Sequence, residues 1–244
     1  MLLMLVAETL AQAAESEGSG FTLMEMWTHS GYIAKGVLIM LGFMLLASIF
    51  VSIERLIAFN RARNQSMQLA ADIVVPLQQG SIDGALKITQ DEQFKSSYLA
   101  GLIRSGLQEL EVRADRPGVE NARRAVEKAH GEELAKMRKG MTILATTGST
   151  APFVGLFGTT FGVINAFAGM ATEGSGLASI SAGISEALIT TGIGIGVAVV
   201  GVWLFNYFNF RTSKVADELS ASEHDFLNWA EKLLQKDDFQ AAGK

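Results

Sequence analysis

The sequence predicts an all-α integral membrane protein with three transmembrane helices and a helical cytoplasmic domain. Three long stretches carry this prediction: residues 36–53 and 140–172 contain no Asp, Glu, Lys or Arg, and residues 174–210 contain only Glu186. A spanning helix needs about 18 predominantly apolar residues, and each stretch is at least that long. The mean hydropathy of +0.27 agrees, because it is too high for an ordinary soluble domain.

The three predicted spans differ in composition. Transmembrane helix 1, over residues 32–59, has Leu, Ile, Met and Phe on every face, which suits contact with lipid. Transmembrane helices 2 and 3, over 140–170 and 183–210, contain more small residues, and a short outer loop over 171–182 joins them. We expect these two helices to form an inner layer, with the first helix outside them.

A stripe of small residues and proline runs along transmembrane helix 2 at heptad spacing. It consists of Gly148, Pro152, Gly155, Thr159, Gly162, Ala166 and Gly169. Small side chains let helix backbones approach closely, which is a main source of helix association in lipid. The four glycines are therefore predicted helix-packing positions, and a ring of identical subunits suits this layering.

Basic residues at the span ends predict the orientation. They are Arg55, Arg61, Arg63, Lys136, Arg138, Lys139, Arg211 and Lys214. Lys and Arg concentrate on the cytoplasmic side of membrane proteins. Residues 1–31 are therefore an outer N-terminal segment, 60–139 a cytoplasmic helical domain and 211–244 a cytoplasmic C-terminal helix.

The N-terminal segment begins with an apolar run, as a signal peptide does, but it lacks the positively charged start of one. We expect an outer tail with Phe21, Met24 and Trp27 at the membrane interface, and the sequence leaves cleavage of residues 1–20 open.

The cytoplasmic parts carry helix signals. Ser81, and Asp115 followed by Pro117, are predicted helix starts. The C-terminal helix has a seam at heptad spacing, formed by Val215, Leu219, Ser222, Phe226, Trp229 and Leu233. Such a seam predicts packing on a neighbour, either an identical subunit or the chain's own cytoplasmic domain.

Glu186 is the strongest functional candidate. It is the only charged residue between Glu173 and Arg211. A charge in hydrocarbon is costly, and such residues mark ion or proton pathways unless they bond another helix for assembly. Thr190 shares a helix face with Glu186, whereas Thr191 lies about 140° away. Thr159 and Thr190 are expected to hydrogen-bond the carboxyl or to order water beside it, and bonding of Thr159 to its own helix is the alternative.

Other classes of function have little support. There is no Cys and the net charge is −5, so thiolate metal sites are excluded and nucleic-acid binding is not indicated. His29, His130 and His224 lie far apart in sequence and lack the spacing of metal ligands. No nucleophile elbow or phosphate loop is present, so we expect no enzyme, no metal and no cofactor other than protons as the coupling ion.

Two segments resemble a known family. GSTAPFVGLFGTTFGVINAF at 148–167 and ISAGISEALITTGIGIGVAV at 180–199 are similar to the MotA/TolQ/ExbB proton-channel family, most of all to its ExbB and TolQ branch. Glu54, Arg55 and Leu56 after the first span agree. The resemblance assigns the proton pathway to Thr159, Glu186 and Thr191, whereas the helical-face argument favours Thr190.

The resemblance also implies the assembly and its work. It implies a homopentamer in the bacterial inner membrane, with the N-terminus in the periplasm and the C-terminus in the cytoplasm. The pore would hold a dimer of an ExbD/TolR-like single-span protein, and a TonB/TolA-like protein would join it. Proton motive force would then drive mechanical work across the envelope, such as outer-membrane transport. Ala182 and Val200 replace prolines usual in the family, which leaves a gliding-motility motor as one alternative; a non-conducting scaffold is the other.

Overall fold

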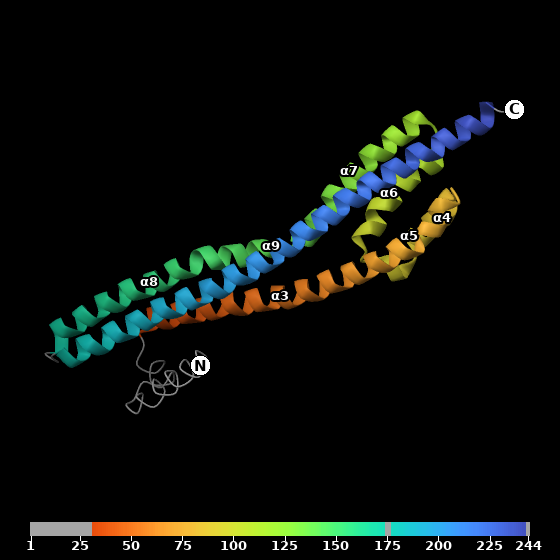
Figure 1. Cartoon of the computed structure of the whole chain (residues 1–244). Coiled ribbons are helices and arrows are strands. Elements are labelled where there is room, and N and C mark those ends of the chain that lie inside the picture. The colour runs from red at the N-terminus through yellow and green to blue at the C-terminus, as the bar shows by residue number, and fades with distance from the viewer. Residues whose placement is uncertain (1–30, 174–176, 243–244) are drawn as a thin grey trace, which may run out of the picture. The chain divides into compact units, whose positions relative to one another are not determined.

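The computed structural model describes residues 31–173 and 177–242, and in these residues it is all-helical (Figure 1). In chain order the helices are α3 (Tyr32–Asp72), α4 (Val74–Gln78), α5 (Ile82–Gln90), the 3₁₀ helix η1 (Glu92–Phe94), α6 (Tyr98–Val112), α7 (Arg116–Arg138), α8 (Met141–Glu173) and α9 (Leu177–Ala242). Three segments are long and apolar enough to cross a membrane: Tyr32–Gln78, Met141–Gly169 and Gly183–Gln235. The predicted fold class is confirmed at this level. The N-terminal segment with Phe21, Met24 and Trp27 lies outside the described residues.

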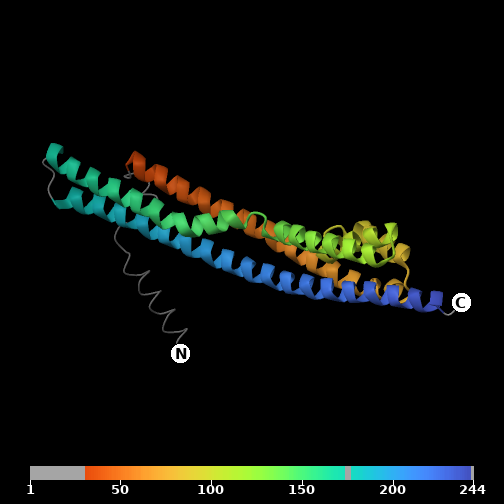
Figure 2. The ribbon, with the colours of Figure 1, turned by 90° about the horizontal axis from the view of Figure 1, so that it is seen from above.

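The chain divides into two compact units. The apolar unit comprises the described residues of Met1–Leu46 and Thr146–Gly201, and the polar unit those of Ala47–Ala145 and Val202–Lys244. In the apolar unit α3, α8 and α9 lie side by side (Figure 2). A small core joins them, with Leu41 from α3, Ala151 from α8 and Ala198 from α9. The outer faces stay apolar, as Phe43 on α3 and Phe153 on α8 show, with 72% and 69% exposure.

The connection between α8 and α9 is shorter than predicted. A loop was expected over residues 171–182, but α8 continues to Glu173 and α9 begins at Leu177. Most of this segment is helical. Gly, Ser and Thr are weak helix formers, but tertiary context readily overrides helix propensity.

N-cap residues mark where the helices of the polar unit begin. Ser81 and Asp115 are the N-caps of α5 and α7, as predicted, and their side chains accept N–H bonds from Gly84 and Gly118. Ser97 caps α6 in the same way, by accepting the N–H of Ala100. Gly140, with φ of +78°, separates α7 from α8. A left-handed residue ends a helix, and glycine adopts that conformation without strain.

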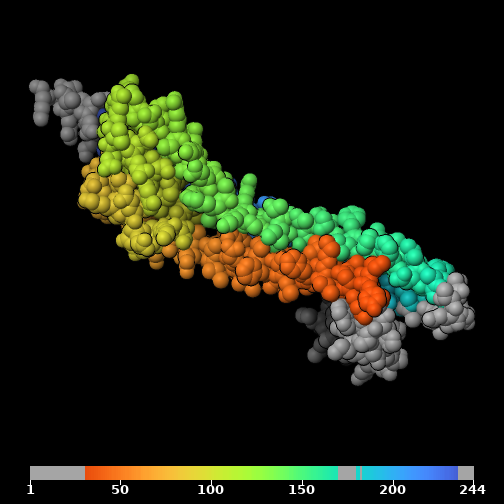
Figure 3. Space-filling model, turned by 180° about the vertical axis from the view of Figure 1, so that it is seen from behind, coloured from red at the N-terminus to blue at the C-terminus, as the bar shows by residue number. Residues whose placement is uncertain are grey.

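The polar unit has one large core that contains residues of α5, α6 and α7. Figure 3 shows these helices gathered together at the surface. The C-terminal seam belongs to this core: Leu219 is fully buried, Phe226 lies against Gly106, and the Trp229 indole N–H donates to the Leu77 carbonyl at 2.7 Å. Of the two interpretations of the seam, the structure shows packing on the chain's own domain. Heptad spacing is compatible with any helical neighbour, so the sequence alone could not distinguish an identical subunit from the chain's own domain.

Tyr98 also joins α6 to α9 in the polar unit. Its hydroxyl, in an almost fully buried side chain, donates to the Glu218 carboxylate. Burial, and then the hydrogen bond to Glu218, raises the pKa of Tyr98 well above its usual value. The tyrosine therefore remains a neutral donor at any physiological pH.

Candidate proton site

Glu186 lies on α9 in the apolar unit and is half-buried. Its Oε1 accepts the backbone N–H of Gly31 at 3.2 Å. The Gly31 carbonyl in turn accepts the N–H of Lys35 at 3.0 Å, so Gly31 is at the start of α3. The first N–H groups of a helix lack partners within it and attract negative charge. The Glu186 carboxyl group therefore accepts a backbone N–H at the first turn of α3 that has no partner within the helix.

Sequence reasoning did not find the contact with Gly31. The two residues are 155 positions apart, and nothing in the local pattern links them. The only signal was that a lone carboxylate in an apolar helix needs a partner.

Thr159 and Thr191 meet between α8 and α9. Their hydroxyl groups hydrogen-bond each other. Thr159 Oγ1 also lies 3.1 Å from the carbonyl oxygens of Gly155 and Ala187. Thr191 Oγ1 lies 3.3 Å from the same Gly155 carbonyl. Because Ala187 directly follows Glu186, the hydroxyl pair lies beside the backbone of the carboxylate's own helical turn.

The hydroxyl pair has two ways to arrange its hydrogens. Each hydroxyl donates one hydrogen and accepts others. In one arrangement Thr191 donates to Thr159, which donates to a carbonyl; in the other Thr159 donates to Thr191, which donates to Gly155. In both arrangements each of the two hydroxyl groups donates one hydrogen bond. A pair that reverses its direction in this way is chemically suited to pass or orient a proton.

Thr190 is placed differently. It is 1% exposed, its hydroxyl donates to the Glu186 carbonyl at 3.0 Å, and its methyl group lies beside Gly158. The structure brings Thr191, not Thr190, to Thr159. Thr190 was predicted from its position on α9 alone, and that position does not reveal that Thr191 faces α8. The role of either residue in proton transfer remains a prediction.

Close approach of α8 and α9 makes the threonine contact feasible. A Cβ at Gly155 would lie 3.0 Å from the Thr190 carbonyl oxygen, and one at Gly162 would lie 2.8 Å from the Ala187 Cβ. Both glycines are therefore at the contact between the two helices. Gly148 is buried, whereas a Cβ at Gly169 would meet no described atom within 4 Å. Gly158, outside the predicted stripe, also faces α9.

The described residues contain no group of three His, Asp or Glu side chains that could hold a metal. The His130 ring instead lies 2.8 Å from a Glu223 carboxylate oxygen in the polar unit.

Comparison with known proteins places these residues in a family. A family profile described as the MotA/TolQ/ExbB proton channel family matches residues 95–221. This range includes Thr159, Glu186 and Thr191, and it spans more than half of the chain.

Individual relatives agree. The Tol-Pal system protein TolQ of Pseudomonas aeruginosa is 38% identical over 137 residues, which cover 50% of this chain and 59% of TolQ. The biopolymer transport protein ExbB of Xanthomonas campestris is 43% identical over 103 residues, with 42% and 41% covered. The chain thus matches less than two thirds of the length of these two proteins. ExbB of Salmonella typhimurium is 33% identical over 195 residues, which cover 75% of each chain. The chain belongs to the MotA/TolQ/ExbB proton channel family.

Proposed function

We propose that this chain is a proton-channel and motor subunit that couples the proton motive force of the bacterial inner membrane to mechanical work across the cell envelope. Family membership supports an energising role in envelope processes. In this proposal Glu186 takes up and releases the proton, and Thr159 and Thr191 pass it or order the water that does.

One observation carries the proposal: the single carboxylate of the apolar part of α9 lies one residue from a contact with a reversible hydroxyl pair. The contact is the hydrogen bond from Thr159 to the carbonyl of Ala187. Glu186 is half-buried rather than sealed, so water or another chain has access to it. An acid in a membrane helix is functional by default because its cost must be offset. Its bond to Gly31 offsets part of that cost.

The proposal includes an assembly. Five copies would form a ring, with a dimer of an ExbD/TolR-like single-span protein in the pore and a TonB/TolA-like protein that receives the work. Large exposed apolar side chains on α3 and α8 support contact with lipid and further subunits. The N-terminus would lie in the periplasm and the C-terminus in the cytoplasm. We propose that the process is transport at the outer membrane; two relatives are named biopolymer transport proteins, which supports transport in general.

The experiment compares Glu186→Gln with the wild type in liposomes. The chain is reconstituted with its single-span partner, and proton uptake is followed with a pH-sensitive dye after a potential is imposed. Glutamine keeps the size and hydrogen-bonding capacity of the side chain but cannot ionise, so the complex should assemble and conduct no protons. Glu127→Gln, on an exposed face of α7, is the matched control and should conduct normally. Equal flux in Glu186→Gln and wild type would overturn the proposal.

A non-conducting scaffold is the second candidate, since the close contacts of Gly155 and Gly162 would assemble helices without any proton movement. The same variant separates the two functions. A scaffold keeps its cellular activity in Glu186→Gln, whereas a proton carrier assembles and fails.

A further inference from the structure

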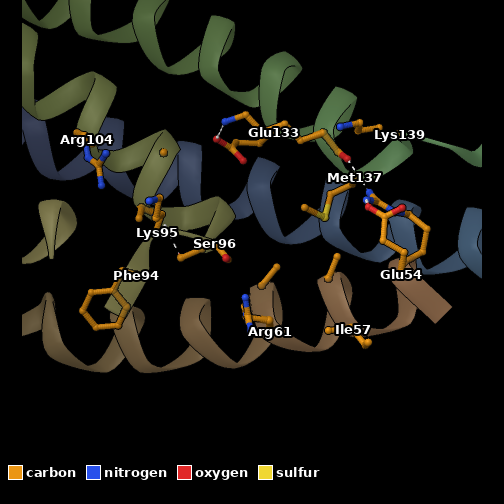
Figure 4. Close-up of a pocket in the computed structure, with 17 residues that line it drawn as sticks. Glu54, Ile57, Arg61, Phe94, Lys95, Ser96, Arg104, Glu133, Met137 and Lys139 are labelled. Carbon is orange, nitrogen blue, oxygen red and sulfur yellow. Dashed lines mark hydrogen bonds and ion pairs between the residues drawn. The ribbon is translucent and has the colours of Figure 1, made fainter. Parts of the chain in front are cut away.

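The polar unit contains a basic pocket of about 510 Å³ between α3, the start of α6 and the end of α7 (Figure 4). Six cationic and two anionic side chains line it. The cations are Arg55, Arg61, Lys95, Arg104, Lys136 and Lys139. Figure 4 shows Arg61 on α3 facing the segment that carries Lys95 and Ser96, with Glu133 and Met137 on α7 opposite.

The positive charge of this basic pocket is only partly compensated. Glu54 pairs with Arg55 at 2.5 Å, and Glu133 pairs with Lys136 at 2.6 Å. Arg61, Lys95 and Lys139 make no ion pair with the described residues. The pocket therefore carries an excess of positive charge that an anion would neutralise.

Arg55 gives a second, independent indication that the pocket binds an anion. It is 6% exposed, and its guanidinium donates from Nη1 to the Lys136 carbonyl at 3.2 Å and from Nη2 to Glu54. Its Nε is buried and has no hydrogen-bond partner among the residues that the structure describes. A buried charged donor left unpaired costs about 1–3 kcal/mol, so such groups in native proteins generally have a ligand or water. Arg55 lines the pocket, so an anion there would lie beside this incompletely paired cation.

The N-terminus of α6 lines the same pocket. Ser96, Ser97, Ala100 and Gly101 contribute to its wall. The α6 helix has 15 residues, and the partial positive charge of its N-terminus favours an anion nearby.

The position of the basic pocket along the chain favours a phosphate that belongs to a lipid. Between Lys35 and Glu54, α3 has no charged residue, and none occurs between Lys139 and Glu173. Glu54 and Lys139 are therefore the first charges beyond two apolar stretches, at the depth where lipid headgroups lie. Basic pockets at this depth bind anionic headgroups.

We propose that the basic pocket binds a phosphate ester, supplied by the headgroup of an anionic phospholipid. The phosphate oxygens accept from Arg61, Lys95 and Lys139, and Arg55 contributes its positive charge to the pocket wall. The two carboxylates of the pocket keep their existing partners. A bound headgroup would tie α3, α6 and α7 together at the membrane surface.

The test uses the purified full chain in a non-ionic detergent. Dioleoylphosphatidylglycerol is titrated and bound lipid is counted by native mass spectrometry; calorimetry with glycerol 3-phosphate measures binding of the soluble ester. The pocket variant is Arg61→Gln with Lys95→Gln, both exposed, so folding should be unaffected, which circular dichroism checks. The control variant, Arg63→Gln with Lys232→Gln, removes the same charge from exposed positions outside the pocket.

We expect the pocket variant to bind phosphatidylglycerol roughly 30-fold more weakly, since each cation near a lipid surface contributes about fivefold. The control variant should bind as the wild type does, and glycerol 3-phosphate should bind weakly or not at all. Equal lipid binding by the two variants would overturn the proposal. Tight binding of glycerol 3-phosphate that is lost only in the pocket variant would keep the phosphate chemistry and overturn the lipid source.

Discussion

At the scale of single residues, the proposed proton pathway depends on the hydroxyl pair of Thr159 and Thr191. Thr191→Val keeps the shape of the side chain and removes one partner of the pair. We expect proton flux in liposomes to fall about tenfold, the effect of losing one hydrogen bond worth about 1.4 kcal/mol in the pathway.

Thr190→Val is the control for that change. Among the described residues the Thr190 hydroxyl bonds the Glu186 carbonyl of its own helix, so its loss leaves the pair of Thr159 and Thr191 intact. We expect near-normal flux. A larger loss in Thr190→Val than in Thr191→Val would mean that the face shared with Glu186 carries the proton.

The sequence supported Glu186 and Thr159 because each stands out locally: one is a charge in an apolar run, the other a hydroxyl in a small-residue stripe. It could not decide between Thr190 and Thr191. That choice depends on which helix packs on which face of α9, and the contact with α8 spans 32 residues of sequence. The Gly31 contact depends in the same way on long-range packing.

At the scale of elements, α8 and α9 approach closely through glycine. Gly155→Ala should lower the thermal stability of the detergent-solubilised chain, because a Cβ there would lie 3.0 Å from the Thr190 carbonyl oxygen and 3.2 Å from the Gly194 Cα. Overpacking of this kind costs about 1–3 kcal/mol. Differential scanning fluorimetry measures the shift.

Gly192→Ala is the matched control on α9, since a Cβ there would meet nothing within 4 Å. Alanine is the better helix former by about 1 kcal/mol, so this variant should be neutral or slightly stabilised. Equal destabilisation of both variants would mean that the two helices do not pack through Gly155.

The part of α9 in the polar unit packs on the chain's own domain. Phe226→Ala should destabilise the polar unit by about 3–5 kcal/mol, because it leaves a cavity beside Gly106. Thermal melting followed by circular dichroism would show a lower midpoint. Asp225→Ala, at an exposed neighbouring position, should leave the midpoint unchanged. If Phe226→Ala alters only the number of subunits and not the midpoint, the seam serves assembly instead.

Elements with local signals were predictable, and those that depend on context were not. Ser81 and Asp115 could be predicted as helix starts because an N-cap involves only the next three residues. The connection predicted over 171–182 was too long because small residues look alike in loops and in closely packed helices. The sequence could not identify which helices the C-terminal seam packs on, because that contact depends on the core formed with α6 and α7.

At the scale of the whole molecule, we expect that the chain cannot form a working proton channel without its partner. We predict that the purified chain forms a pentamer by native mass spectrometry and that it conducts few protons in liposomes without its single-span partner. The physical reason is that a pore built from one carboxylate per subunit needs a second acid to hand the proton on. A stable monomer, or a brisk proton leak from the chain alone, would contradict this assembly.

Infrared difference spectroscopy of the energised complex tests the central claim most directly. If Glu186 carries the proton, imposing a proton gradient should produce a carboxylic-acid band with a matching loss of carboxylate, and Glu186→Gln should abolish both. The account predicts that the same bands persist in Glu127→Gln. An identical spectrum in Glu186→Gln and the wild type would show that this side chain does not change protonation and would contradict the proposed mechanism.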